Sequence, residues 1–227
     1  MCIRDRYLFF DLDDDSSIMI HLRMTGKLSL VAADRPDLRH QRAALVLDNG
    51  RDLRFSDQRK FGRVLHMHPA DVELLDARIG IEPLGDDFTA EWLQARLARR
   101  TGKIKAVLLD QALIGGLGNI YVDEALFSAG IHPERVSNTL SLPELTRLVF
   151  AIRQVLQAAL GRRGTTFSSF EDADGQSGGY GVNLQVYGKG GKERCPICSG
   201  PLLRLTVGGR GTSYCPHCQP IFGTAEN

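Results

Sequence analysis

The sequence predicts a multidomain α+β fold, in which an antiparallel β-sandwich precedes a helical domain and a small cysteine-bearing finger. Three observations predict it. Short apolar runs separated by turn residues fill the first third of the chain, apolar residues recur at helical spacing from about Pro69, and two Cys-X-X-Cys pairs lie near the C-terminal end. The expected domains are residues 1–68, 69–185 and 186–227.

The first domain is expected to consist of short antiparallel strands. Turn residues bound its apolar runs, among them Asp13-Asp14-Asp15 and Asn49-Gly50. The Asn-Gly pair favours a tight hairpin because both residues tolerate positive φ. A series of such strands is typical of a β-sandwich or barrel. The predicted strands are residues 7–12, 17–22, 27–32, 43–47, 52–55 and 63–68.

In the second domain, the apolar residues follow the 3.6-residue period of helices. Thr89 is a candidate N-cap, and Ser141 with Glu144 three residues later has the pattern of a capping box. Residues 162–181 are rich in Gly, Ser and Asp, which predicts a long mobile loop. The predicted helices are residues 89–99, 103–113, 120–129 and 142–161.

The two Cys-X-X-Cys pairs are separated by sixteen residues. Tetrahedral Zn²⁺ needs four soft ligands, and two tight turns that each carry two thiols can supply them. Between the pairs we expect a strand, a glycine turn over residues 208–211 and a second strand, with Arg210 at the tip. Two disulfides or four unrelated thiols are the alternatives. The expected cofactor is one structural Zn²⁺ held by Cys195, Cys198, Cys215 and Cys218.

The composition is 43% hydrophobic and 24% charged, as in ordinary globular proteins. No apolar run reaches the length of a membrane span and no secretory signal pattern opens the chain, so we expect no membrane partner. Four of the five cysteines belong to the zinc site, and this usage favours a cytoplasmic protein. The net charge is only +1, yet basic residues gather at residues 96–105 and 188–219. Such segregation is typical of proteins that bind phosphate backbones, although two solvated surfaces would give the same pattern.

A glycine-rich turn at residues 115–118 lies between two predicted helices and is followed by Asn119. Glycines leave backbone N–H groups uncovered, and a helix N-terminus attracts phosphate. Such a turn alone is a weak signal, since a helix C-cap would explain one glycine. The order helix, double glycine turn, Asn and helix, with Lys105 one short helix upstream, is more specific for phosphate binding.

Residues 116–133, Gly-Leu-Gly-Asn-Ile-Tyr-Val-Asp-Glu-Ala-Leu-Phe-Ser-Ala-Gly-Ile-His-Pro, closely resemble the helix–two-turn–helix of the formamidopyrimidine-DNA glycosylases. The resemblance runs from about Tyr7 to Gln219 and includes residues 21–26, 56–62, 164–166, 184–188 and the zinc finger. It implies base-excision repair of double-stranded damaged DNA by a monomeric, nucleoid-associated bacterial enzyme. The implied enzyme is a bifunctional DNA glycosylase/AP lyase, which removes 8-oxoguanine and formamidopyrimidines through an imine with an N-terminal proline.

The resemblance also implies roles for particular residues. Met24, Arg59 and Phe61 match the side chains that fill the space left by an extruded nucleotide. Taken alone, Met24 and Phe61 would be core residues and Arg59 an ion-pair partner of Asp57. Arg210 is implied in the elimination step as well as in phosphate binding. The residues implied to contact DNA are His40, Arg59, Arg100, Lys105, Asn119 and Arg210, and those of the lesion-capping loop are Thr165, Thr166, Gly175 and Tyr180.

The chain departs from the family pattern at its start. It begins Met-Cys-Ile-Arg-Asp-Arg, without the Pro-Glu that supplies the nucleophile and the general acid, and Arg6 stands at the position of the family's catalytic lysine. Arginine stays protonated and is a poor proton shuttle. We therefore expect an incomplete, N-terminally truncated β-sandwich and an inactive chain as written. Asp123 and Glu124 are expected to cap or solvate their helix.

Two other functions fit parts of the pattern. One is a non-catalytic protein that binds damaged DNA, and the other is a glycosylase of the endonuclease VIII type, which acts on oxidised pyrimidines. The Met24, Arg59 and Phe61 set and the long loop at residues 165–181 favour the oxidised-purine branch.

Overall fold

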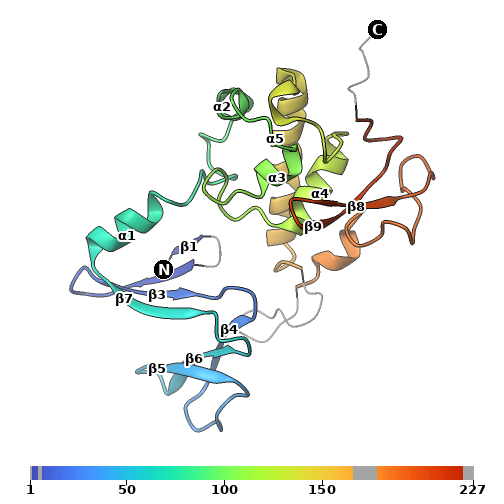
Figure 1. Cartoon of the computed structure of the whole chain (residues 1–227). Coiled ribbons are helices and arrows are strands. Elements are labelled where there is room, and N and C mark those ends of the chain that lie inside the picture. The colour runs from blue at the N-terminus through green and yellow to red at the C-terminus, as the bar shows by residue number, and fades with distance from the viewer. Residues whose placement is uncertain (1, 5–6, 166–177, 222–227) are drawn as a thin grey trace. The chain divides into compact units, whose positions relative to one another are not determined.

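The computed structural model describes residues 2–4, 7–165 and 178–221, and its chain forms two compact units (Figure 1). Unit 1 comprises Met1–Arg78 and Ala159–Val182, and unit 2 comprises Ile79–Ala158 and Asn183–Asn227. In this division the helical segment and the finger belong to the same unit, because buried side chains, described below, join them. The three domain bounds given above stay a prediction.

Unit 1 contains two antiparallel sheets. One has the strand order β1 (Cys2–Arg4), β2 (Tyr7–Asp11), β3 (Ser17–His21) and β7 (Arg63–Met67), and the other has the order β4 (Gly26–Ala32), β6 (Arg51–Asp57) and β5 (Gln41–Val46). Their inner faces share one apolar core, since side chains of both sheets pack together. The predicted β-sandwich is therefore confirmed. The buried members of this core are Leu8, Ile20, Leu28 and Phe55.

Turn chemistry fixes the register of these strands. The β5–β6 hairpin closes through the Leu47 N–H to the Arg51 carbonyl at 2.9 Å, with Gly50 at φ 75° as the Asn-Gly pair predicted. The bounds of the six predicted strands agree with the structure to within two residues at every end. Helix α1 (Pro69–Asp76), which begins with proline, was not among the predicted helices, although the change from strand to helix spacing was placed at Pro69.

Unit 2 is built on four α-helices among its described residues: α2 (Ala90–Leu97), α3 (Ile104–Leu108), α4 (Asn119–Ser128) and α5 (Leu142–Leu160), the last of which ends in unit 1. Their apolar faces form the largest core of the protein. Both predicted caps are present. The Thr89 hydroxyl accepts from the Trp92 N–H at 3.1 Å, and the Ser141 N–H donates to Glu144 at 2.7 Å.

Two elements of unit 2 differ from the prediction. Helix α3 ends at Leu108 rather than at residue 113, because Asp110 turns the chain and accepts from the Ala112 N–H at 3.1 Å. The finger hairpin, β8 (Leu203–Val207) and β9 (Arg210–Tyr214), has a turn of only Gly208 and Gly209, both at positive φ. Arg210 therefore begins the second strand, opposite Val207, beside the tip rather than within the turn.

The predicted loop at residues 162–181 is described only at its base. Thr165 and Gly179 form an isolated antiparallel bridge, and the Tyr180 N–H donates to the Gly164 carbonyl at 2.9 Å. Tyr180 is buried and begins a short 3₁₀ helix, Tyr180–Asn183. Thr166 and Gly175, like Arg6, lie outside the described residues. Among the described residues, no helix is both long and apolar enough to cross a membrane.

Candidate nucleic-acid interface and metal centre

Two neighbouring turns of unit 1 bring Met24, Arg59 and Phe61 together. The Arg59 guanidinium lies 4.8 Å from the centre of the Phe61 ring, and its Nη1 is 3.3 Å from the Met24 sulfur. The Met24 and Phe61 side chains are nevertheless 63% and 55% exposed. The alternative of two core residues is therefore wrong. An exposed apolar pair held by a cation is suited to a partner that buries it.

His40 lies close to the same turns. It adopts φ 63°, and its carbonyl accepts from the Asp57 N–H at 3.0 Å. Asp57 does not pair with the Arg59 guanidinium, as the alternative assumed, but accepts from the backbone N–H of Arg59 at 3.2 Å. The turns that carry His40, Met24, Arg59 and Phe61 thus meet around one buried residue.

In unit 2, the glycine-rich turn leads directly into helix α4. Gly116 has φ 75°, and the N-cap Gly118 has no side chain to cover the first N–H groups of the helix. A Cβ placed on Gly118 would meet nothing within 4 Å, so the N-cap position itself borders open space. The Asn119 side chain donates to the Gly211 carbonyl at 3.2 Å and so ties the turn to the hairpin. Helix α4 therefore begins directly after the glycine-rich turn, as predicted, while phosphate binding at this helix end stays a prediction.

The buried side chain of Lys105 also contacts the hairpin of β8 and β9. Its ammonium donates to Asp123 at 2.6 Å, to the Gly211 carbonyl at 3.0 Å and to the Thr212 hydroxyl at 2.7 Å, and the residue is 0% exposed. In this structure Lys105 is not available for the phosphate contact that the resemblance implied, because its charge is used inside unit 2. Burial lowers the pKa of Lys105, against the opposing effect of Asp123, and burial raises the pKa of Asp123 to about 6.

Arg210 follows the hairpin turn and is exposed. The next residue is Gly211, whose carbonyl receives the hydrogen bonds of both Lys105 and Asn119. The backbone that carries Arg210 is thus fixed to α3 and to the start of α4. An exposed cation on a fixed strand, beside an open helix N-terminus, is suited to bind phosphate.

The four cysteines of the finger lie together. Their sulfur atoms are all within 4.8 Å of one another, with Cys195 to Cys218 at 3.8 Å and Cys198 to Cys215 at 3.5 Å, and all four thiols are free. Ligand atoms of a tetrahedral site with Zn–S bonds of about 2.3 Å lie about 3.8 Å apart. The donor set therefore fits one structural Zn²⁺, and the two-disulfide alternative is wrong.

Sequence families match the chain in the same order as these features. The formamidopyrimidine-DNA glycosylase N-terminal domain matches residues 3–64, the H2TH domain of that glycosylase matches residues 79–171, and the zinc finger found in FPG and IleRS matches residues 192–221. The formamidopyrimidine-DNA glycosylase of Herpetosiphon aurantiacus is 47% identical over 216 residues, which cover 95% of this chain and 79% of that protein. This chain belongs to the formamidopyrimidine-DNA glycosylase family.

Other members of the family agree in sequence and in structure. The formamidopyrimidine-DNA glycosylase of Pelotomaculum thermopropionicum is 45% identical over 96% of this chain and 79% of its own length. The Lactococcus lactis Fpg in complex with an abasic site containing DNA superposes with a TM-score of 0.88, at 38% identity, over 96% of this chain and 80% of that one. The chain is thus a zinc-bearing DNA repair glycosylase by family, and the resemblance seen in its motifs is confirmed.

Asp123 and Glu124 are buried, which the sequence did not predict. Both were expected to cap or solvate helix α4, but they are 2% and 3% exposed. Glu124 accepts from three successive backbone N–H groups, those of Gln185, Val186 and Tyr187, at 2.8 to 2.9 Å. The two carboxylates hold the finger and the segment that leads to it against α4, which is why helices and finger form one unit.

Arg100, another predicted DNA contact, also has a partner within the protein. Its Nη1 lies 3.0 Å from Asp110, and the two side chains are 41% and 38% exposed. A phosphate would compete with Asp110 for this guanidinium. The role of Arg100 in binding DNA stays a prediction.

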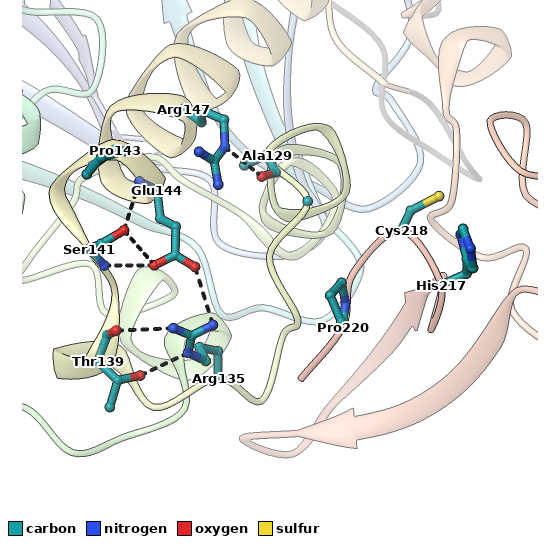
Figure 2. Close-up of a pocket in the computed structure, with 11 residues that line it drawn as sticks. Ala129, Arg135, Thr139, Ser141, Pro143, Glu144, Arg147, His217, Cys218 and Pro220 are labelled. Carbon is teal, nitrogen blue, oxygen red and sulfur yellow. Dashed lines mark hydrogen bonds and ion pairs between the residues drawn. The ribbon is translucent and has the colours of Figure 1, made fainter. Parts of the chain in front are cut away.

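A hollow of about 630 Å³ lies between the end of α4, the start of α5 and the second zinc knuckle (Figure 2). Its charged groups are occupied by the protein. Arg135 lies 3.3 Å from Glu144 and donates to Thr139, and Arg147 points toward the Ala129 carbonyl. Predicted site residues do not line it, apart from the metal ligand Cys218. The hollow therefore adds nothing to the DNA interface.

Proposed function

We propose that the chain recognises oxidised purines, 8-oxoguanine and formamidopyrimidines, in duplex DNA and serves a bifunctional glycosylase/AP lyase reaction. The observation that carries this proposal is the exposed group Met24, Arg59 and Phe61. Phe61 is suited to stack where a nucleotide has left the duplex, Met24 to fill irregular space and Arg59 to hydrogen-bond the unpaired base. These are the contacts that a base-extruding enzyme needs.

Phosphate contacts would supply the affinity. In unit 2 we propose the open N-terminus of α4, with Asn119, and the exposed cations Arg210 and Arg100 as anchors. In unit 1 we propose His40 and Arg59. Lys105 would act indirectly, by fixing the strand that carries Arg210. Such contacts position the protein and make binding weaken with salt, and one copy of the chain supplies all of them.

The solved relatives support damaged DNA as the partner. Lactococcus lactis Fpg has been crystallised with an abasic site containing DNA, with a Fapy-dG containing DNA and with an oxidized pyrimidine containing DNA. The last of these keeps oxidised pyrimidines as a second class of lesion. We place the chain at the nucleoid for the same reason, its proposed DNA partner.

The proposed chemistry uses an amine that attacks C1′ of the damaged nucleotide and an elimination step assisted by Arg210. DNA binding does not depend on that amine and is the measurement that tests recognition.

The test is selective binding. We expect the chain to bind a duplex with an abasic analogue opposite cytosine more tightly than the undamaged duplex, and more weakly as salt increases. Phe61→Ala should reduce that preference about tenfold, because stacking of one base on an aromatic ring contributes about 1–3 kcal/mol. Val46→Ala is the matched control, since Val46 is an 81% exposed apolar residue of the same unit. Equal affinity for both duplexes, or equal effects of the two substitutions, would refute the proposal.

A further inference from the structure

We infer that Asp57 is the positioning residue that holds the turns of Met24 and of Arg59 and Phe61 in the arrangement required for entry into a duplex. The inference rests on the proposed role of these three side chains. Asp57 ends strand β6 and is 1% exposed, so its carboxylate is shielded from solvent and cannot contact DNA itself.

One carboxylate joins both turns. Its Oδ1 accepts from the Thr25 hydroxyl and from the Arg59 N–H at 3.2 Å, and its Oδ2 accepts from the Gly62 N–H at 2.7 Å. Thr25 follows Met24, while Arg59 and Gly62 lie on either side of Phe61. The hydrogen bonds therefore fix the backbone next to all three exposed side chains. Hydrogen bonds to a charged acceptor are the stronger kind, so this bridge is worth more than neutral contacts.

Glycines allow the turns to approach the carboxylate. A Cβ on Gly62 would lie 2.4 Å from the Phe55 ring and 3.2 Å from Asp57 Oδ2, and a Cβ on Gly26 would lie 2.3 Å from the Leu22 carbonyl oxygen. Gly62 therefore packs directly against Phe55 and the Asp57 carboxylate, and Gly26 closes the turn that begins at Leu22. The exposed residues owe their position to the buried layer beneath them.

Both side-chain oxygens of Asp57 must act as hydrogen-bond acceptors to hold the two turns. Burial raises the pKa of Asp57, but hydrogen bonds from Thr25 and from the N–H groups of Gly62, Arg59 and Phe61 outweigh it and hold the pKa below its ordinary value. An asparagine would place an NH₂ group against backbone N–H donors. Asp57→Asn therefore removes hydrogen bonds from one of the two turns while keeping the volume of the side chain.

A third segment is tied to Asp57 through its backbone alone. The Asp57 N–H donates to the His40 carbonyl, and the Asp57 carbonyl accepts from the Arg42 guanidinium, both at 3.0 Å. A change of side chain leaves these bonds in place. Asp57→Asn should therefore disturb Met24, Arg59 and Phe61 while the proposed phosphate contact of His40 persists, so the expected loss is of lesion preference and not of all binding.

The experiment compares Asp57→Asn, Phe61→Ala and the double variant in binding to abasic-analogue and undamaged duplexes. A 2-aminopurine base beside the abasic analogue reports stacking in the gap. We expect Asp57→Asn to reduce the preference about tenfold, to reduce the 2-aminopurine response and to weaken binding to the undamaged duplex less than binding to the abasic duplex. Its effect on the preference should be smaller in the Phe61→Ala background, because both changes act on the same group of side chains. A general loss of structure would instead add its full effect to that of Phe61→Ala. Asp34→Asn, an exposed aspartate of the same unit, is the control.

The outcomes separate the two proposals. Suppose that Asp57→Asn folds and keeps the wild-type preference and stacking, while Phe61→Ala loses both. This result would overturn the inference about Asp57 but not the proposed function. Unchanged preference in Phe61→Ala would refute the proposed role of the exposed group, and the inference with it. If Asp57→Asn does not fold, Thr25→Val decides, because it removes one donor to the carboxylate: wild-type preference in Thr25→Val would also overturn the inference.

Discussion

The ion pair of Lys105 and Asp123 gives the sharpest prediction about the stability of unit 2. The two side chains are 0% and 1% exposed, and Lys105→Met removes the cation while keeping an apolar side chain of similar length. Asp123 would retain only the Ser213 N–H, at 3.2 Å, among its hydrogen bonds in the described structure. Removing one partner of a buried pair costs about 3–5 kcal/mol, because the other charge is left uncompensated. We expect a loss of that size at pH 7.5.

The loss should depend on pH. Burial already raises the pKa of Asp123 to about 6 with Lys105 present, and removing the cation raises it further. A carboxyl whose pKa is higher in the folded than in the unfolded chain gains stability as pH falls toward the unfolded value. At pH 5 Asp123 of the variant is protonated and the uncompensated charge is gone. The destabilisation by Lys105→Met should therefore be smaller at pH 5 than at pH 7.5.

Urea unfolding measures both values. Trp92 is the only tryptophan of the chain and packs against the core of unit 2, so its fluorescence follows this unit. Lys103→Met is the matched control, because Lys103 is 51% exposed and pairs with Glu134 at the surface, where such pairs contribute about 1 kcal/mol or less. A loss for Lys105→Met no larger than that of the control, or one that is the same at both pH values, would refute the reasoning.

Two further predictions concern unit 2. Arg210→Ala should reduce the slope of log K against log salt by about 1, because one phosphate contact is lost. Arg204→Ala, on the other strand of the hairpin, is the control and should leave the slope unchanged. Fluorescence titrations of DNA binding at several salt concentrations measure both slopes. Burial lowers the pKa of His132, whose Nδ1 accepts from the Glu134 N–H at 3.1 Å, so its contribution to stability is complete above pH 6.5 and is lost as pH falls. His132→Asn keeps an acceptor but does not titrate. As pH falls from 7 to 5, the free energy of unfolding of this variant should therefore decrease less than that of the wild type. An identical pH dependence of the two proteins would contradict the prediction.

The elements that could be predicted are those that local chemistry fixes. The Asn49-Gly50 turn, the Thr89 cap and the box of Ser141 with Glu144 each depend on residues within a few positions of one another, and each is present. The zinc ligands belong to the same class, since each knuckle is local and only the joining of two knuckles needs the metal.

The sequence could not show which acidic and basic residues are buried and which face solvent. Lys105 was predicted to face phosphate and Asp123 to face water, yet they meet in the interior. A charge is buried only when partners from other segments satisfy it, and these partners are the Thr212 hydroxyl and the Ser213 N–H, about ninety or more positions away along the chain. No periodicity within α3 or α4 records such partners.

The same reasoning explains why Asp57 escaped notice while Met24, Arg59 and Phe61 did not. Motif resemblance selects residues that touch the ligand, because their side chains are unusual for an exposed turn. Asp57 looks like an ordinary partner for Arg59 until the structure shows its oxygens accepting from Thr25, Arg59 N–H and Gly62 N–H. A carboxylate with several donors converging on it from separate turns sets their spacing, and spacing decides whether three exposed side chains act together. The buried acceptors beneath a surface are thus as much a part of its specificity as the side chains that a ligand meets.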